Sequence, residues 1–170
     1  ESVEEGLLAN RFDIAIVLTS NISNPELETD TLLRSTRRLW VPQGHRLADR
    51  RKVQFGDIAE EDYIMLTVDE AANTTMKYWT FGSTPPRVKM RTSSIEAVRS
   101  MVANGQGVTV LSDMVYRPWS LEGRRIVTVE TDPVAPSMDV GLAWRRGTEM
   151  TPATQVLYTY FRQAFNTPQI

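Results

Sequence analysis

The sequence contains no cysteine and only one histidine, His45, and these absences exclude several kinds of chemistry. Without cysteine the chain forms no disulfide and has no thiolate nucleophile, so its composition leaves the compartment undetermined. A lone histidine without cysteine argues against a transition-metal site. His45 lies in a polar loop between Gly44 and Arg46, where a solvated surface role is expected. We therefore expect no metal and no cofactor.

Long apolar runs and a basic face are also missing. No apolar stretch approaches the roughly 20 residues that span a bilayer, and there is no signal-peptide core. The 19 Lys and Arg residues are scattered along the chain and are outweighed by 21 Asp and Glu residues. The sequence thus argues against a membrane partner and against direct binding of nucleic acid by this chain.

Catalytic motifs are absent as well. There is no G-x-S-x-G elbow, and NGQGV (104–108) supplies only a G-x-G that follows a predicted helix, whereas a phosphate-binding loop precedes one. Carboxylate pairs such as Glu60-Glu61 lie at the polar ends of elements, where favourable interaction with a helix dipole explains them. The sequence therefore argues against an enzyme.

What is present is an alternation of helical and strand patterns. Helices are predicted over residues 3–10, 53–61 (a short turn), 70–81 (capped by Asp69), 95–103, 113–120 (short, broken at Pro118) and from Thr151-Pro152 onward. Strands are predicted over residues 12–17, 28–42 (two in succession), 63–68, 87–92, 108–112, 125–130 and 138–146. This alternation predicts an α/β fold with mostly parallel sheets.

Two of these elements carry specific expectations about burial. The strand FDIAIV (12–17) is an almost unbroken apolar run, which is typical of a strand covered on both faces. The last helix has an apolar stripe that we expect to be buried, formed by Val156, Leu157, Tyr160, Phe161 and Phe165.

Hydroxyl side chains follow three of the predicted strands. Thr19 and Ser20 follow FDIAIV, Thr67 follows YIML, and Thr92, Ser93 and Ser94 follow RVKM. Ligands of α/β proteins bind beyond the carboxyl ends of strands, and several hydroxyls in one crevice make a neutral, directional lining. These six residues are therefore candidates for binding a small polar ligand.

Ser93 also has a purely structural interpretation. With Glu96 three residues later, the stretch S-S-I-E fits a capping box, and for Ser93 alone this interpretation is favoured. Thr92 and Ser94 are not used by such a cap, so we expect both to remain available to a ligand.

Four segments resemble the effector-binding domain of LysR-type transcriptional regulators. LLANRFDIAIV (7–17) resembles the family's "L…G.lDlai" stretch, with Asn10 where glycine is common, and LWVPQGHRLAD (39–49) resembles "v.P..HPLA", with Arg46 in place of proline. VRSMVANGQGVTVLS (98–112) resembles "v..mV..G.Gi..lP", with Ser112 replacing the proline, and residues 141–161 are similar to the closing strand and helix. Asparagine is the next-best residue after glycine for a left-handed turn, so Asn10 is a mild departure.

The resemblance implies a two-lobed α/β fold of the periplasmic-binding-protein type 2. Lobe one would comprise residues 1–57 and 140–170, lobe two would comprise 58–139, and two crossing strands would join them. A small polar or carboxylated metabolite would act as inducer in the cleft between the lobes. The loop after the first strand and the start of the helix in segment 92–102 would contact it.

The resemblance also implies parts and partners beyond this chain. A winged helix-turn-helix, and the opening strand and helix of lobe one, would precede Glu1, so we expect a fragment of a longer regulator. DNA would be contacted only through that absent domain. A homodimer or homotetramer and a cytoplasmic location are expected from the family.

Two alternatives remain open at this point. A solute-binding protein of a transport system would have the same cleft, but its gene would encode a secretory signal and no helix-turn-helix. An enzyme on this scaffold would need a nucleophile or an acid–base pair that the sequence does not offer.

Overall fold

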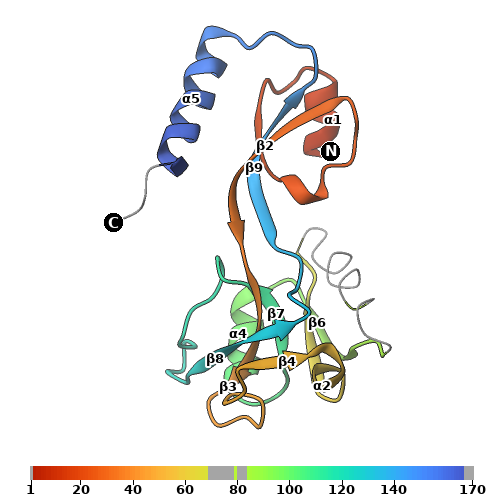
Figure 1. Ribbon diagram of the computed structural model, residues 1–170, viewed down its shortest axis with the longest axis vertical. Helices are drawn as coiled ribbons and strands as arrows, with labels where there is room; N and C mark the ends of the chain where they lie inside the picture. Colours follow the sequence, from red (N-terminus) through yellow and green to blue (C-terminus); the bar gives the residue numbers. More distant parts are fainter. Residues whose placement is uncertain (1, 69–78, 80–83, 167–170) are drawn as a thin grey trace. The chain divides into compact units, whose positions relative to one another are not determined.

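The computed structural model of the protein describes residues 2–68, 79 and 84–166, and Figure 1 labels its helices and strands. The predicted helix over 70–81 and its capping residue Asp69 lie outside the described residues, apart from Trp79.

The chain divides into two units. Unit 1 comprises Glu1–Ser35 and Met138–Ile170, and unit 2 comprises Thr36–Ser137. The chain therefore passes between the units twice, once in each direction. Within the described residues no helix has the length and apolar character needed to cross a bilayer.

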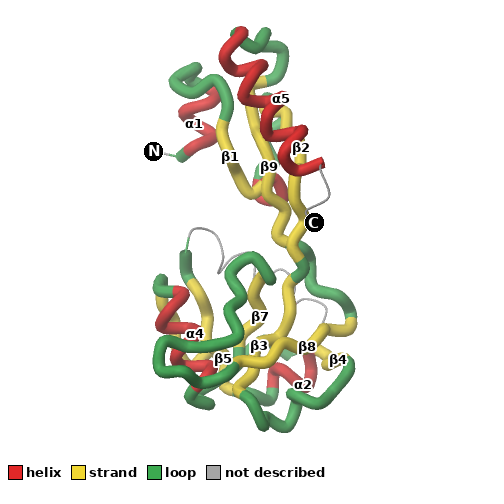
Figure 2. Tube along the Cα trace, turned by 90° about the vertical axis from the view of Figure 1, so that its left-hand side faces the viewer, coloured by secondary structure: helices red, strands yellow, loops and turns green. Residues whose placement is uncertain are grey.

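Unit 1 is built on a three-stranded sheet with the order β1-β9-β2, in which both strand pairs are antiparallel. Figure 2 shows these strands side by side, with α1 and α5 beside them. The elements of unit 1 are α1 (Val3–Leu8), β1 (Ala15–Leu18), the 3-10 turn η1 (Thr19–Asn21), β2 (Leu27–Ser35), β9 (Met138–Arg145) and α5 (Pro152–Asn166).

The start of unit 1 folds as its local sequence predicts. Ser2 caps α1 in a reciprocal capping box with Glu5, which satisfies two backbone N–H groups at the helix start. Asn10 has φ = 56°, the left-handed conformation expected where the family often has glycine. The capping pattern and the turn residue thus predicted this segment correctly.

The burial expected for β1 is wrong. The strand begins at Ala15 rather than at Phe12, and it pairs only with β9 among the described strands. Ile16 on this edge strand is 60% exposed. Ala15 and Val17 pack against the core of unit 1. Because successive side chains of a strand point to opposite faces, Ile16 lies on the other face, which the described residues leave uncovered.

Of the five α5 stripe residues expected to be buried, Val156, Leu157, Tyr160 and Phe165 are exposed and Phe161 is partly buried. Among the described residues of the helix only Thr154 is buried, whereas Val156 is 70% and Tyr160 is 65% exposed. The helix contacts β2 through Tyr158 and Arg162, which both bind the Asp30 carboxylate. Positions two residues apart lie on nearly opposite sides of a helix, so this polar attachment turns Val156 and Tyr160 outward.

Unit 2 contains a four-stranded sheet with the order β4-β8-β3-β7 and a separate β5-β6 pair. A parallel bridge between Tyr63 and Val108 places β5 next to the segment that enters β7. The elements of unit 2 are β3 (Arg37–Pro42), β4 (Lys52–Gln54), α2 (Phe55–Ala59), β5 (Asp62–Leu66), β6 (Arg87–Thr92), α4 (Ile95–Ala103), β7 (Thr109–Ser112) and β8 (Ile126–Asp132).

The α/β class is correct, but the expectation of mostly parallel sheets is wrong. β5-β6 and β4-β8 are parallel, whereas β3 runs antiparallel to both β7 and β8, and β9 runs antiparallel to both β1 and β2. The double passage of the chain accounts for two of these pairs. Strands β2 and β3 form the outgoing pass and β8 and β9 the returning pass, so β2 runs antiparallel to β9 and β3 to β8.

The short helix predicted over 113–120 is also absent. Residues after Ser112 form hydrogen-bonded turns, and Trp119 then bridges Arg125 in an antiparallel sense. Pro118 lacks the N–H that a helix would need at this position. The chain therefore reverses its direction in turns before β8, although the apolar spacing predicted a helix.

The boundary between the units differs from the lobe boundary expected from the family. The predicted change after residue 57 falls inside unit 2, because β3 pairs with β7 and β8, and β4 pairs with β8. β3 and β4 thus belong to the same sheet as β7 and β8, within unit 2.

Gly141 offers a direct test of the register in unit 1. A Cβ atom at this position would overlap the Asp30 carbonyl oxygen on β2, whereas a Cβ at Gly56 in α2 would contact nothing within 4 Å. We expect Gly141→Ala to lower the free energy of unfolding by about 1–3 kcal/mol. Gly56→Ala, the matched control, should leave it unchanged or raise it by up to about 1 kcal/mol. Equal stabilities of the two variants in urea denaturation would contradict the β2-β9 register.

Candidate functional site

The parallel β5-β6 pair brings four of the six predicted site residues to one edge of unit 2. Leu66 at the end of β5 pairs with Thr92 at the end of β6. The Thr67 N–H then donates to the Thr92 carbonyl at 2.8 Å. Thr67 and residues 92–94 therefore lie together beyond the carboxyl ends of two neighbouring strands, where α/β proteins commonly bind ligands.

The cap of α4 is Ser94, and the prediction that Ser93 serves as the cap is wrong. The Ser94 hydroxyl accepts the N–H of Ala97 at 3.2 Å. The Thr92 hydroxyl accepts the N–H of Ser94 at 3.1 Å. The hydroxyls of Thr92 and Ser94, which we expected to be free, thus accept backbone N–H groups. The reason is that the helix starts one residue later than S-S-I-E suggested.

This arrangement leaves Ser93 as the available hydroxyl at the start of α4. Its side chain is exposed and has no hydrogen-bond partner in the described part of the protein. The first N–H groups of a helix have no intrahelical acceptor, and Ser94 satisfies only that of Ala97. The N–H groups of Ile95 and Glu96 therefore remain available next to the Ser93 hydroxyl.

The carboxylate of Glu96 does not oppose an anion at this helix start as strongly as its position suggests. It forms an ion pair with Arg99, a buried residue whose other terminal nitrogen donates to the Val115 carbonyl at 2.8 Å. The ion pair offsets the negative charge. The positive end of the α4 dipole thus keeps part of its attraction for a negatively charged group.

The other two predicted residues, Thr19 and Ser20, belong to unit 1. Thr19 is only 8% exposed, and its hydroxyl shares a 2.8 Å hydrogen bond with that of Thr31 and lies 3.4 Å from the Asp139 carbonyl. Ser20, in contrast, is exposed in η1. Thr19 therefore ties the turn after β1 to both β2 and β9, and Ser20 carries the accessible hydroxyl.

Two residues that the sequence did not single out as site residues lie at the same edge of unit 2. Ser112 ends β7, which runs in the same direction as β5. Arg37 pairs with Ser112 across the antiparallel β3-β7 ladder. No local motif marks Arg37, since only the strand pairing brings it to this edge.

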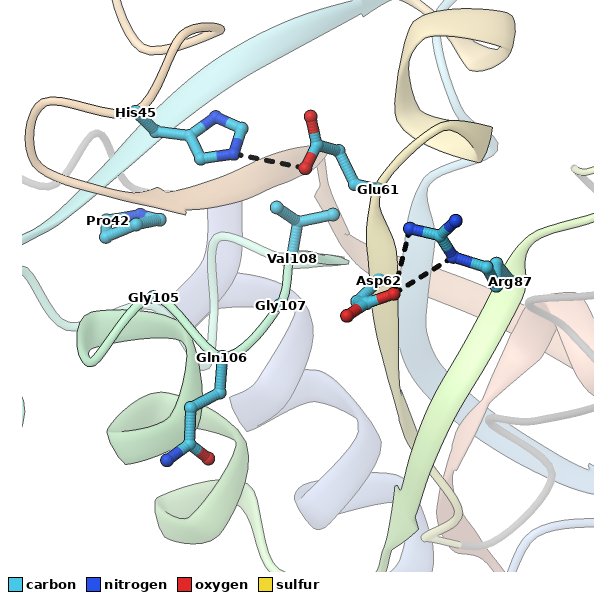
Figure 3. A pocket seen from close by; sticks show the side chains of 9 residues that line it. All are labelled: Pro42, His45, Glu61, Asp62, Arg87, Gly105, Gln106, Gly107 and Val108. Atoms are coloured by element: carbon cyan, nitrogen blue, oxygen red, sulfur yellow. Dashed lines mark hydrogen bonds and ion pairs between the residues drawn. The ribbon is translucent and has the colours of Figure 1, made fainter.

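A small cavity of about 130 Å³ lies at the opposite edge, near the first residues of β5 and β6 (Figure 3). Its charged groups are already paired. Asp62 binds Lys89 and Arg87, and the hydrogen bond from Lys89 keeps the pKa of Asp62 below its usual value. The cavity is lined by Pro42, His45, Glu61, Asp62, Arg87, Gly105, Gln106, Gly107 and Val108.

His45 in this cavity has a structural role, so the expected solvated surface role is wrong. Its side chain is only 17% exposed. Nδ1 accepts the N–H of Leu47 at 3.2 Å, and Nε2 lies 3.4 Å from the Glu61 carboxylate. Glu61 in turn accepts a hydrogen bond from Arg46 at 2.6 Å. In the described residues no group of three acidic or histidine side chains could hold a metal ion.

The assignment of the α4 cap predicts a clear difference between two neighbouring serines. Ser94→Ala should lower the free energy of unfolding by about 1 kcal/mol, the typical cost of losing a helix N-cap. Ser93→Ala should leave it unchanged, because that hydroxyl has no partner. Urea denaturation of the two variants measures both effects, and the reverse order would restore Ser93 as the cap.

Comparison with known proteins agrees with this architecture. The family model for the LysR substrate binding domain matches residues 1–166. A curated relative, the RuBisCO operon transcriptional regulator of Allochromatium vinosum, is 26% identical over 154 residues, which are 90% of this chain and 50% of the relative. The chain thus spans about half the length of that regulator.

Solved structures share the fold. The C-terminal domain of a probable LysR family regulator from Rhodococcus sp. RHA1 has a TM-score of 0.82 and 25% identity, and the match covers 94% of this chain and 78% of that one. The regulatory domain of Synechocystis PCC6803 CcmR in complex with 2-PG has a TM-score of 0.80 and 18% identity, covering 98% and 79%. The effector binding domain of QuiR in complex with shikimate has a TM-score of 0.76 and 16% identity, covering 99% and 78%. With the family match over nearly its whole length, this chain belongs to the LysR substrate-binding domain family and has its two-lobed, periplasmic-binding-protein-like α/β fold.

Proposed function

We propose that this chain is the inducer-sensing part of a LysR-type transcriptional regulator. The observation that carries the proposal is the shared edge of β5 and β6, where the Thr67–Thr92 hydrogen bond gathers hydroxyls and free backbone N–H groups. The relatives with assigned names are transcriptional regulators, which favours this function over a transport protein. Nothing in the described residues forms a catalytic constellation, and we propose no enzymatic activity.

The ligand that fits this edge is a small polar metabolite with a carboxylate or a comparable anionic group. Ser93 would donate its hydroxyl hydrogen, and the N–H groups of Ile95 and Glu96 would add two further donors at the positive end of α4. Thr67 would contribute a hydroxyl from the neighbouring strand end. Similar domains bind shikimate, a carboxylate, in QuiR and 2-PG in CcmR.

The remaining predicted residues have more limited roles in this proposal. Thr92 and Ser94 would shape the start of α4, since their hydroxyls already hold backbone N–H groups. In unit 1, Ser20 would offer an exposed hydroxyl to a ligand, and Thr19 would fix the turn that carries Ser20.

Sensing requires that the ligand favour one arrangement of the two units over another. A ligand with equal affinity for both arrangements shifts nothing, however tightly it binds. A coupling free energy of about 1–3 kcal/mol suffices for a several-fold change in response. In the whole regulator this bias would pass through a homodimer or homotetramer to DNA-binding domains outside this chain, in the cytoplasm where the DNA lies.

A binding experiment tests the ligand site. We expect a thermal-shift screen of carboxylated metabolites, shikimate and 2-PG among them, on the domain extended at its N-terminus to identify a stabilising compound. Ser93→Ala should then weaken its binding by up to about tenfold, the loss of roughly one hydrogen bond. Gln106→Ala, an exposed polar residue at the opposite edge, serves as the control and should bind normally. Unchanged affinity in Ser93→Ala would contradict the proposed site.

A further inference from the structure

The two passes of the chain between the units are held together differently on either side of the unit boundary. In unit 1, β2 and β9 form a continuous ladder that ends at the pair Ser35 and Met138. Beyond it the outgoing pass continues into β3, whereas the returning pass is the irregular segment 133–137. Pro133 and Pro136 in this segment have no N–H, so a regular ladder cannot continue there.

Where the ladder ends, hydrogen bonds from a side chain connect the two passes. The Arg37 guanidinium donates from one nitrogen to the Pro136 carbonyl at 2.5 Å and to the Ser137 carbonyl at 2.9 Å. Arg37 is the second residue of unit 2 on the outgoing pass, and Ser137 is its last residue on the returning pass. One charged donor therefore bridges the two passes directly beside the boundary, and hydrogen bonds from a charged donor are stronger than neutral ones.

Both ends of this bridge are anchored in unit 2. On the outgoing side, the Thr36 carbonyl accepts the N–H of Asp113 at 2.9 Å, and Arg37 pairs with Ser112. On the returning side, Ala135 is buried, and its N–H donates to the Thr131 hydroxyl at 3.0 Å. Each segment thus has its own attachment to unit 2, and the guanidinium is the side-chain link between them.

The bridge also lies at the edge that carries the proposed ligand site. Arg37 is paired with Ser112 at the end of β7, and β7 runs in the same direction as β5, which ends at Leu66, next to Thr67. We propose that Arg37 is a positioning residue, a clasp that keeps the two passes at a fixed spacing and so limits the range of arrangements open to the units. Without the clasp each pass could bend separately, and that range would widen.

The clasp has a second consequence, which rests on the proposed sensing function. A ligand can shift the units only between arrangements that the connection permits. If that range widens, ligand binding at the β5-β6 edge shifts the population of the favoured arrangement by less. Loss of the clasp should then reduce the response to an inducer more than the affinity for it.

The absence of cysteine makes the clasp directly testable on the full chain. Leu121→Cys in unit 2 and Val156→Cys in unit 1, both at highly exposed positions, allow two spin labels to be attached. Pulsed electron paramagnetic resonance then gives the distribution of distances between them. We expect Arg37→Met, which keeps an unbranched side chain but removes its donors, to broaden this distribution. Arg37→Lys, which keeps one charged donor group, should broaden it less.

The control is Arg38→Met. Arg38 lies next in the sequence and forms an ion pair with Asp113 at 3.2 Å, so its loss should leave the distribution unchanged. An unbroadened distribution in a folded Arg37→Met protein would overturn the clasp, and so would equal broadening in Arg38→Met. If Arg37→Met fails to unfold cooperatively, Arg37→Leu, which also removes the donors, replaces it, and a distribution like that of the parent protein then counts against the proposal. No ligand is needed, so failure of the sensing function and failure of the clasp are distinguishable.

Discussion

The parallel pairing of β5 with β6 is the constraint on which the candidate site depends. Parallel strands end at the same edge, so the pairing of Leu66 with Thr92 delivers Thr67 and the start of α4 to one place. The same pairing places Asp62 and Arg87 together at the opposite edge, where they bind each other. One edge of the pair is thus closed by ion pairs, while the other keeps a free hydroxyl and free N–H groups.

The hydroxyl residues of this protein divide into those that hold the backbone and those that remain available. Ser94 and Thr92 fix the start of α4, and Thr19 fixes the turn after β1 to the two crossing strands. Ser93 and Ser20 are exposed beside them. Donors held in place lose little entropy when a ligand binds, so the two backbone-holding hydroxyls at the start of α4 suit the site that we propose at Ser93.

Much of this fold could be predicted from the sequence, because its signals are local. The capping box at Ser2 and the left-handed turn at Asn10 depend only on neighbouring residues. The exposure of Ile16 and of Val156 could not be predicted, since an apolar pattern shows which face is apolar but not what covers it. In the site, two adjacent serines left the cap uncertain by one residue, and Arg37 reaches the edge only through the β3-β7 pairing.

We propose that a ligand binds at the carboxyl edge of the β5-β6 pair. The most direct measurement follows backbone amide chemical shifts by NMR while a stabilising metabolite is added. We expect the largest changes at Thr67 and at residues 93–96. Changes centred instead on His45 and Gly105–Val108, at the opposite edge, with none at the start of α4, would contradict it.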